Sequence, residues 1–88
     1  MFCMWGKLIK NNRLLNDTTI SIGDYSLSRT QMVFQALDEI CCCFDLGKPI
    51  WLDANVRDFQ LHSKTRFKQD NFMEHIEFDF LEIRIIEE

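Results

Sequence analysis

The amino-acid sequence predicts an α+β two-layer sandwich, in which one long helix packs on one face of an antiparallel or mixed sheet. Strand-like segments at residues 3–22 and 78–86 enclose a strongly marked helix at residues 29–45. The 88 residues suit a single domain, residues 1–88, since chains divide into several domains only at greater length. A hydrophobic fraction of 47%, including eight Phe, is sufficient for an ordered core.

The first segment has the pattern of a β-hairpin. Asn11-Asn12 separates two apolar stretches, and asparagine tolerates the left-handed backbone that a two-residue turn needs. Such a turn fixes the register, with these opposed pairs on the face expected to be buried: Ile9 with Leu14, Trp5 with Thr18, and Cys3 with Ile20. Leu8 and Leu15 are expected on the opposite, wetter face.

The helix at residues 29–45 has a marked beginning and a marked end. Ser28 and Gln31 form a capping box, in which the serine caps the free amides and the glutamine reaches back. Gly47 is expected to end the helix in a left-handed conformation. The apolar stripe that should dock on the sheet has helical spacing and comprises Val33, Leu37, Ile40 and Phe44.

The second half of the chain predicts two further strands and a shorter helix. Residues 49–52 are expected to form a short strand, edge-placed at its proline end. A helix capped by Asp53 or Asn55 follows and ends near residue 62. The next stretch is ambiguous, and the last strand either begins at Phe80 or carries a β-bulge beside it. The predicted order is therefore ββαβαβ.

Charge is unevenly distributed along the chain, whose net charge is −4. Residues 1–13 hold cations without acids, whereas acids dominate residues 70–88. The two ends could face each other across the sheet and supply each other's cross-strand partners.

The segment at residues 57–68 is a candidate nucleic-acid or phosphate site. Its proposed contacts are Arg57, Lys64, Arg66, Phe67 and Lys68. Cations would bind the phosphates while an aromatic ring stacks on a base. The alternative is an amphipathic helix with a solvated face plus a basic connector, paired with the acidic tail. An isoelectric point near 5.1 favours this alternative.

The cysteines and histidines form no catalytic, cofactor or metal motif that we recognise. Neighbouring side chains on a helix diverge by about 100°, so Cys41-Cys42-Cys43 cannot converge on one metal. We expect these thiols to be small apolar filler, with Cys42 the most exposed. Redox activity of Cys42 is a hypothesis that rapid thiol labelling would test. His62 and His75 are expected to be ordinary polar residues.

A surplus of apolar residues predicts an interface. Its candidates are Leu8, Leu15, Trp51 and Ile86. The chain is therefore expected to be a non-enzymatic interaction or regulatory module. Its partner would be another protein or a second copy in a homodimer.

Location follows from the same composition. Four cysteines without a secretory leader predict a reducing, cytoplasmic compartment. No stretch approaches the ~20 apolar residues of a membrane span, and no membrane partner is expected.

Three stretches resemble those of short, uncharacterised bacterial proteins: Trp5-Gly6-Lys7-Leu8-Ile9-Lys10, Pro49-Ile50-Trp51-Leu52-Asp53 and Phe78-Asp79-Phe80-Leu81-Glu82-Ile83. The similarity spans nearly the whole chain, and it implies a bacterial, cytoplasmic origin. It implies no activity, ligand or catalytic residue.

Overall fold

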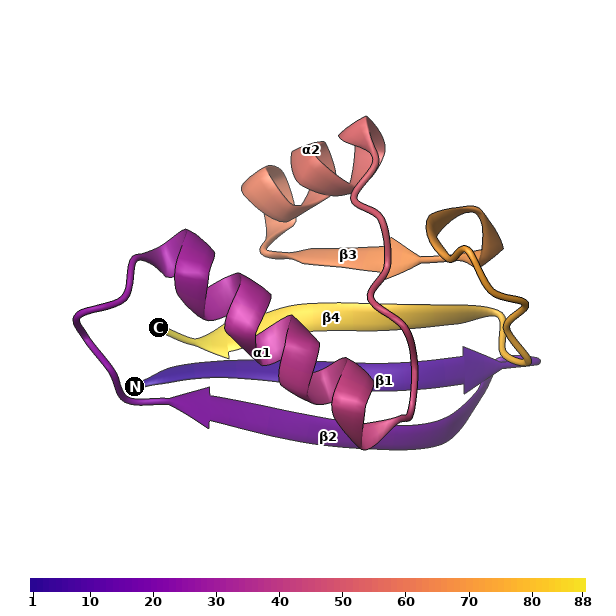
Figure 1. Cartoon of the computed structure of the whole chain (residues 1–88), viewed down its shortest axis with the longest axis horizontal. Coiled ribbons are helices and arrows are strands. Elements are labelled where there is room, and N and C mark those ends of the chain that lie inside the picture. The colour runs from indigo at the N-terminus through magenta and orange to yellow at the C-terminus, as the bar shows by residue number, and fades with distance from the viewer.

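The computed structural model describes residues 1–88 and contains a four-stranded antiparallel sheet with two helices. The elements in chain order are β1 (Phe2–Lys10), β2 (Arg13–Ile22), α1 (Arg29–Cys43), α2 (Asp53–His62), β3 (Lys64–Phe67), the 3-10 turn η1 (Gln69–Asn71) and β4 (Phe80–Glu87). Helix α1 crosses one face of the sheet, and α2 lies beside β3 (Figure 1). The α+β prediction is confirmed at this level.

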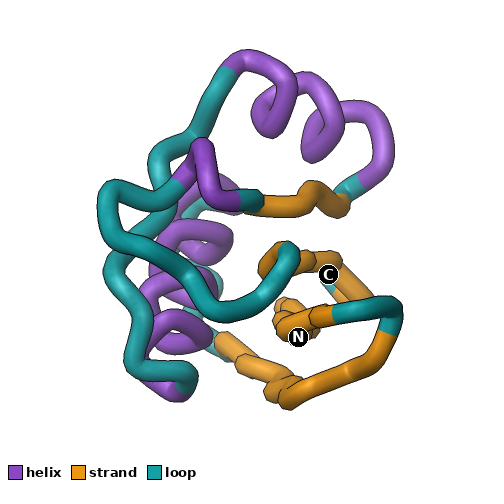
Figure 2. The backbone as a smooth tube through the Cα atoms, turned by 90° about the vertical axis from the view of Figure 1, so that its right-hand side faces the viewer, coloured by secondary structure: helices purple, strands orange, loops and turns teal.

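The two ends of the chain form the centre of the sheet. Strand order is β2-β1-β4-β3, and every neighbouring pair is antiparallel. The expected pairing of the first strand with the last is therefore confirmed. Strands β2 and β3 are the two edges. Helix α1 lies on one side of the sheet, while the opposite side carries no helix (Figure 2).

The predicted order ββαβαβ is wrong, because the third strand lies later in the chain. The observed order is ββααββ. Residues 49–52 form a loop, and Ile50 in this loop donates its amide to the carbonyl of Asn71 at 2.6 Å. Asn71 Nδ2 donates in return to the Ile50 carbonyl at 2.8 Å. The backbone of Ile50 is thus satisfied by a turn, and the ambiguous stretch supplies strand β3 instead.

Helix α1 begins as predicted but ends by a different device. The capping box of Ser28 and Gln31 is present. At the other end the left-handed residue is Asp45, with φ 56°, and Leu46 donates its amide to the Cys41 carbonyl at 2.9 Å. These are the features of a Schellman motif. Gly47 was the wrong candidate; its amide donates to Glu74 Oε1 at 2.7 Å.

The hairpin has the predicted turn, but a bulge shifts the register beyond it. Asn11 and Asn12 both have positive φ, 53° and 63°, and Ile9 lies opposite Leu14 as predicted. A shift of one residue between Leu8 and Ile9 leaves Leu15 as the additional residue. Two of the predicted pairs are therefore wrong by one position: Trp5 lies opposite Thr19, and Cys3 lies opposite Ser21.

The buried face of β1 is the one expected to be wet. Phe2, Met4 and Gly6 are buried beneath the helix layer, whereas Cys3 and Trp5 on the other face are half-buried. The physical reason is Gly6, since a Cβ built there would lie 2.6 Å from Ile40 Cγ2. Only the glycine face lets the helix approach this closely.

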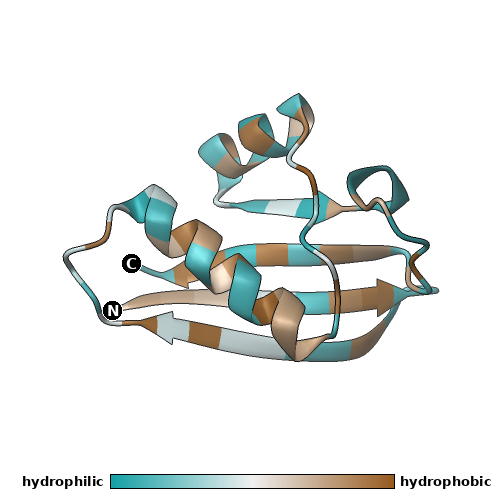
Figure 3. Ribbon diagram, in the orientation of Figure 1, coloured by the Kyte–Doolittle hydropathy of each residue, from teal (hydrophilic) through white to brown (hydrophobic).

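The helix stripe docks on the sheet as predicted, although on this face and not on the expected one. Val33, Leu37 and Ile40 are buried, and Phe44 packs at the margin of the core. On the sheet, Leu81 and Ile83 of β4 are fully buried. Figure 3 shows hydrophobic segments alternating with hydrophilic ones along both α1 and β4.

Candidate functional site

Three of the predicted nucleic-acid contacts lie together beside strand β3. Lys64, Arg66 and Lys68 line an open groove of about 540 Å³ between α2, β3 and η1. The acids Asp58 and Asp70 line the same groove. It is therefore a polar groove of mixed charge.

Glu82 neutralises part of this groove. Its side chain is only 7% exposed and lies 2.8 Å from Arg66 Nε and 3.1 Å from Lys7 Nζ. Burial alone would raise the pKa of Glu82, but the hydrogen bonds from Arg66 and Lys7 outweigh it and lower the pKa. Arg66 also stacks on Phe80, 4.5 Å from the ring centroid. The guanidinium is thus engaged within the fold.

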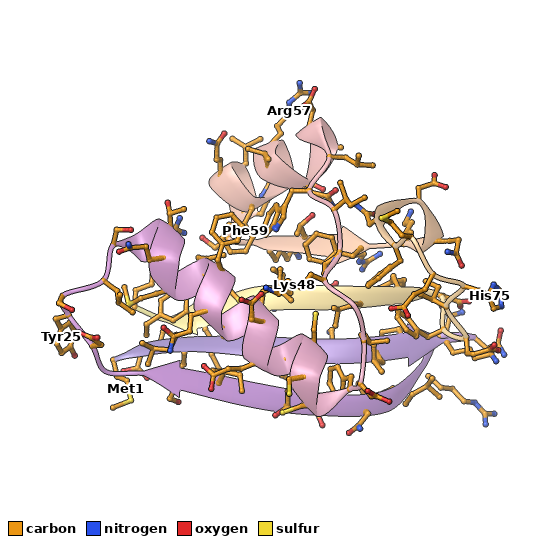
Figure 4. All side chains as sticks on the ribbon, in the orientation of Figure 1. Met1, Tyr25, Lys48, Arg57, Phe59 and His75 are labelled. Atoms are coloured by element: carbon orange, nitrogen blue, oxygen red, sulfur yellow. The ribbon has the colours of Figure 1, made fainter.

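The other two predicted contacts are placed elsewhere. Phe67 is fully buried, and its ring packs edge-on against Trp51 at 5.1 Å, so it cannot stack on a base in this structure. Arg57 is exposed and projects outward from α2, whereas Phe59 on the same helix points inward (Figure 4). The groove retains cations without the predicted aromatic. Nucleic-acid binding stays a prediction.

The four predicted interface residues do not form one patch. Leu8 and Trp51 pack against the core, because the even face of β1 is the buried one and Trp51 inserts between aromatic rings. Leu15 and Ile86 are 54% and 52% exposed. They lie at opposite ends of the sheet, since Leu15 adjoins Leu8 and Ile86 adjoins Met4.

The three consecutive thiols have different surroundings. Cys41 is buried, and burial raises the pKa of its thiol to about 11. Cys42 and Cys43 are exposed, so the expectation of apolar filler holds for Cys41 alone. Exposure of Cys42 was predicted; its redox role stays a hypothesis.

The histidines lie apart in the fold. His62 lines the groove beside β3, and the exposed His75 has Nε2 3.5 Å from Glu77 Oε1. No group of three His, Cys, Asp or Glu side chains is placed to hold a metal ion.

Strand β2 has a free sheet edge, a feature that was not predicted from the sequence. This strand has ten residues and pairs only with β1. Asp17 donates its amide to Asn16 Oδ1, a side chain of the same strand, at 2.9 Å. In an antiparallel pair, successive residues direct their backbone amide and carbonyl groups alternately toward the partner strand and away from it. The backbone groups of Asp17, Thr19 and Ser21 therefore point away from β1. The side chains of these residues are exposed as well.

This β2 edge carries few of the features that normally protect an edge strand. Lysine, proline, β-bulges, short length and a covering helix or loop are the usual protections. A bulge is present at Leu15, at one end of the strand. The regular part of β2, Asn16–Ile22, contains neither lysine nor proline, and its one charge is Asp17. The run Thr18-Thr19-Ile20 has high β-propensity. A stretch of high β-propensity that lacks charge and proline is the feature of the sequence from which an open edge could have been predicted.

The opposite edge is protected. Strand β3 has only four residues. Asn55 Nδ2 of α2 donates to the outward carbonyl of Arg66 at 2.9 Å, and Asn71 Oδ1 accepts the Lys68 amide at 3.0 Å. Helix α2 and turn η1 therefore close the β3 edge, and β2 is the edge left open.

Comparison with known proteins found no protein-family model, no curated protein and no solved structure that matches this chain. Neither helix combines the length and hydrophobicity needed to cross a membrane.

Proposed function

We propose that the protein is a non-enzymatic interaction module that binds a partner polypeptide by strand addition at the β2 edge. The observation that supports this most is the contrast between the two edges. Strand β3 is short and closed by side chains of α2 and η1. Strand β2 is long and leaves the backbone groups of alternate residues facing outward.

Strand addition suits the chemistry of this edge. The outward amides and carbonyls of Thr19 and Ser21 can form main-chain hydrogen bonds to an extended peptide, and such bonds supply the affinity in this mode of recognition. The exposed side chains beside them are small and polar, so they tolerate many partner side chains. Nearby, Trp5 Nε1 donates to Asp17 Oδ2 at 2.9 Å and supports the outer face of the edge.

A peptide library tests this proposal. Phage-displayed extended peptides should be captured by the wild-type protein, with enrichment of alternating β-branched residues. Thr19→Pro removes an outward amide while leaving the ladder to β1 in place, and proline is tolerated on an edge. We expect Thr19→Pro to weaken peptide binding at least about tenfold, the equivalent of 1.4 kcal/mol.

Thr19→Val is the matched control, since it changes the same side chain and keeps the amide. It should bind the selected peptides about as well as the wild type. Failure of the monomeric protein to enrich any peptide, or equal binding by Thr19→Pro and Thr19→Val, would exclude strand addition at this edge.

A further inference from the structure

We infer that the strand added to the β2 edge is β2 of a second copy, so that two copies form one continuous antiparallel sheet. This inference rests on the proposed function and names the partner. A symmetric dimer uses the same surface on both copies. An edge strand can therefore form such a dimer only when it is complementary to a second copy of itself that runs antiparallel. The β2 edge meets that requirement in one particular register.

The regular part of β2 defines this register. The bulge at Leu15 bounds it on one side and the strand end at Ile22 on the other. The midpoint of Asn16–Ile22 is Thr19. A two-fold axis at Thr19 is therefore the placement that pairs every regular residue with another regular residue. Any shift leaves part of the edge unpaired or opposes it to the bulge.

Backbone geometry is compatible with this axis. The outward-facing residues are Asp17, Thr19 and Ser21, and an axis at Thr19 sets outward-facing residues of one copy against those of the other. Each opposed pair exchanges two hydrogen bonds in an antiparallel ladder, giving about six new bonds. The local bond from the Asp17 amide to Asn16 Oδ1 must open when the strands join.

Side-chain chemistry also favours this axis. It places Thr19 opposite Thr19 of the second copy, and paired threonines are favourable cross-strand neighbours. It places Asp17 opposite Ser21, whose hydroxyl can donate to the carboxylate. An axis at Asp17 would instead oppose two like charges, which is destabilising. Repulsion between the two Asp17 carboxylates thus disfavours the register with its axis at Asp17. The alternating direction of the backbone groups alone would allow that register.

The resulting assembly follows from the monomer. Strand order becomes β3-β4-β1-β2-β2-β1-β4-β3, so both remaining edges are the protected β3 strands. Both α1 helices lie on one face, because a two-fold axis perpendicular to the sheet preserves its faces. A single pair of strands is a small interface. We therefore expect a weak dimer, with a dissociation constant in the micromolar range.

Cysteine crosslinking tests the register. Thr18→Cys, Thr19→Cys and Ile20→Cys are compared under mild oxidation after Cys3, Cys42 and Cys43, the cysteines that are not buried, have been changed to Ser. Only a residue on the two-fold axis lies directly opposite itself, with Cα atoms about 5.5 Å apart, within disulfide range. Thr19→Cys should form the covalent dimer fastest. Faster crosslinking at position 18 or 20 would overturn the proposed register.

Mass measurement tests the dimer itself. By light scattering at about 100 μM, the wild type and Thr19→Val should have the dimer mass, and Thr19→Pro the monomer mass with an unchanged circular dichroism spectrum. A monomeric wild type that does not crosslink through Thr19→Cys overturns the second copy as partner. If that monomer still captures peptides in a Thr19→Pro-sensitive way, strand addition stands. If it captures none, both proposals fail.

Discussion

At the scale of single residues, Gly6 marks a close approach between sheet and helix. A Cβ at this position would lie 2.6 Å from Ile40 Cγ2 and 2.9 Å from Ile40 Cδ1. Ile40 is fully buried, so it has little freedom to move away in a closely packed core. The absent side chain of Gly6 therefore sets the distance between α1 and β1.

Gly6→Ala should lower the free energy of unfolding by about 1–3 kcal/mol, the usual cost of overpacking a core. Gly23→Ala is the control, because its Cβ would meet only Met1 Cε at an ordinary 3.7 Å. The control should be neutral or slightly stabilising, since alanine restricts the unfolded chain. Urea denaturation measures both. Equal effects at the two glycines would show that the approach at Gly6 is not tight.

At the scale of elements, a buried asparagine pair joins α2, β3 and η1. Asn55 Nδ2 donates to Thr65 Oγ1 at 3.0 Å and to the Arg66 carbonyl at 2.9 Å. Asn71 Nδ2 donates to Asn55 Oδ1 at 2.7 Å and to the Ile50 carbonyl at 2.8 Å. No buried side-chain nitrogen or oxygen is left without a partner. The pair thus fixes α2 against the β3 edge.

Asn71→Ala should lower the free energy of unfolding by about 1–3 kcal/mol, because it leaves buried polar groups unsatisfied. In a double-mutant cycle with Asn55→Ala, the two changes should couple by about 0.5–3 kcal/mol. Gln35→Ala, at an exposed site on α1, should stay within about 0.5 kcal/mol. Additive effects of Asn55→Ala and Asn71→Ala in chemical denaturation would rule out a cooperative pair.

Sequence signals for the elements differ in their range. The capping box of Ser28 and Gln31 and the Asn11-Asn12 turn are local, and both were predicted correctly. Strand β3 was not, because its place depends on Asn55 and on pairing with β4, far along the chain. Likewise the loop at residues 49–52 had the composition of a strand, but hydrogen bonds to Asn71 hold it as a loop.

At the scale of the whole molecule, charge links three strands. Glu82 of β4 accepts hydrogen bonds from Lys7 of β1 and Arg66 of β3. The first and last strands thus supply each other's charged partners, as the uneven charge distribution predicted. Because the carboxylate is nearly covered, its ionisation state is coupled to the stability of the fold.

This coupling predicts how stability depends on pH. The pKa of Glu82 in the folded protein is below its ordinary value of 4.5, so its stabilising contribution is fully present above about pH 4.5. The contribution is lost as the pH falls through the lower, folded-state pKa. At pH 7, Glu82→Gln should lower the free energy of unfolding by about 1.5–3 kcal/mol, the range for hydrogen bonds to charged groups.

Urea denaturation between pH 7 and pH 2.5 checks this sign. The difference between wild type and Glu82→Gln should be largest at pH 7 and shrink below pH 4.5. Glu39→Gln, at an exposed site on α1, should differ little from wild type throughout. A Glu82→Gln difference that grows toward acid pH would contradict the lowered pKa.

The amino-acid sequence by itself determined the α+β class, the start of α1, its apolar stripe and the hairpin turn. These features depend on contacts between residues a few positions apart. Only the tertiary structure decided which face of β1 is buried, where the third strand lies and which edge stays open. The physical reason is that these choices depend on docking of Ile40 over Gly6, on the extra residue at Leu15 and on the asparagines that close β3. The Ile40–Gly6 contact, the bulge at Leu15 and the asparagines that close β3 all involve contacts between different elements. The edge of β2 is free because the other strands pair elsewhere in the sheet.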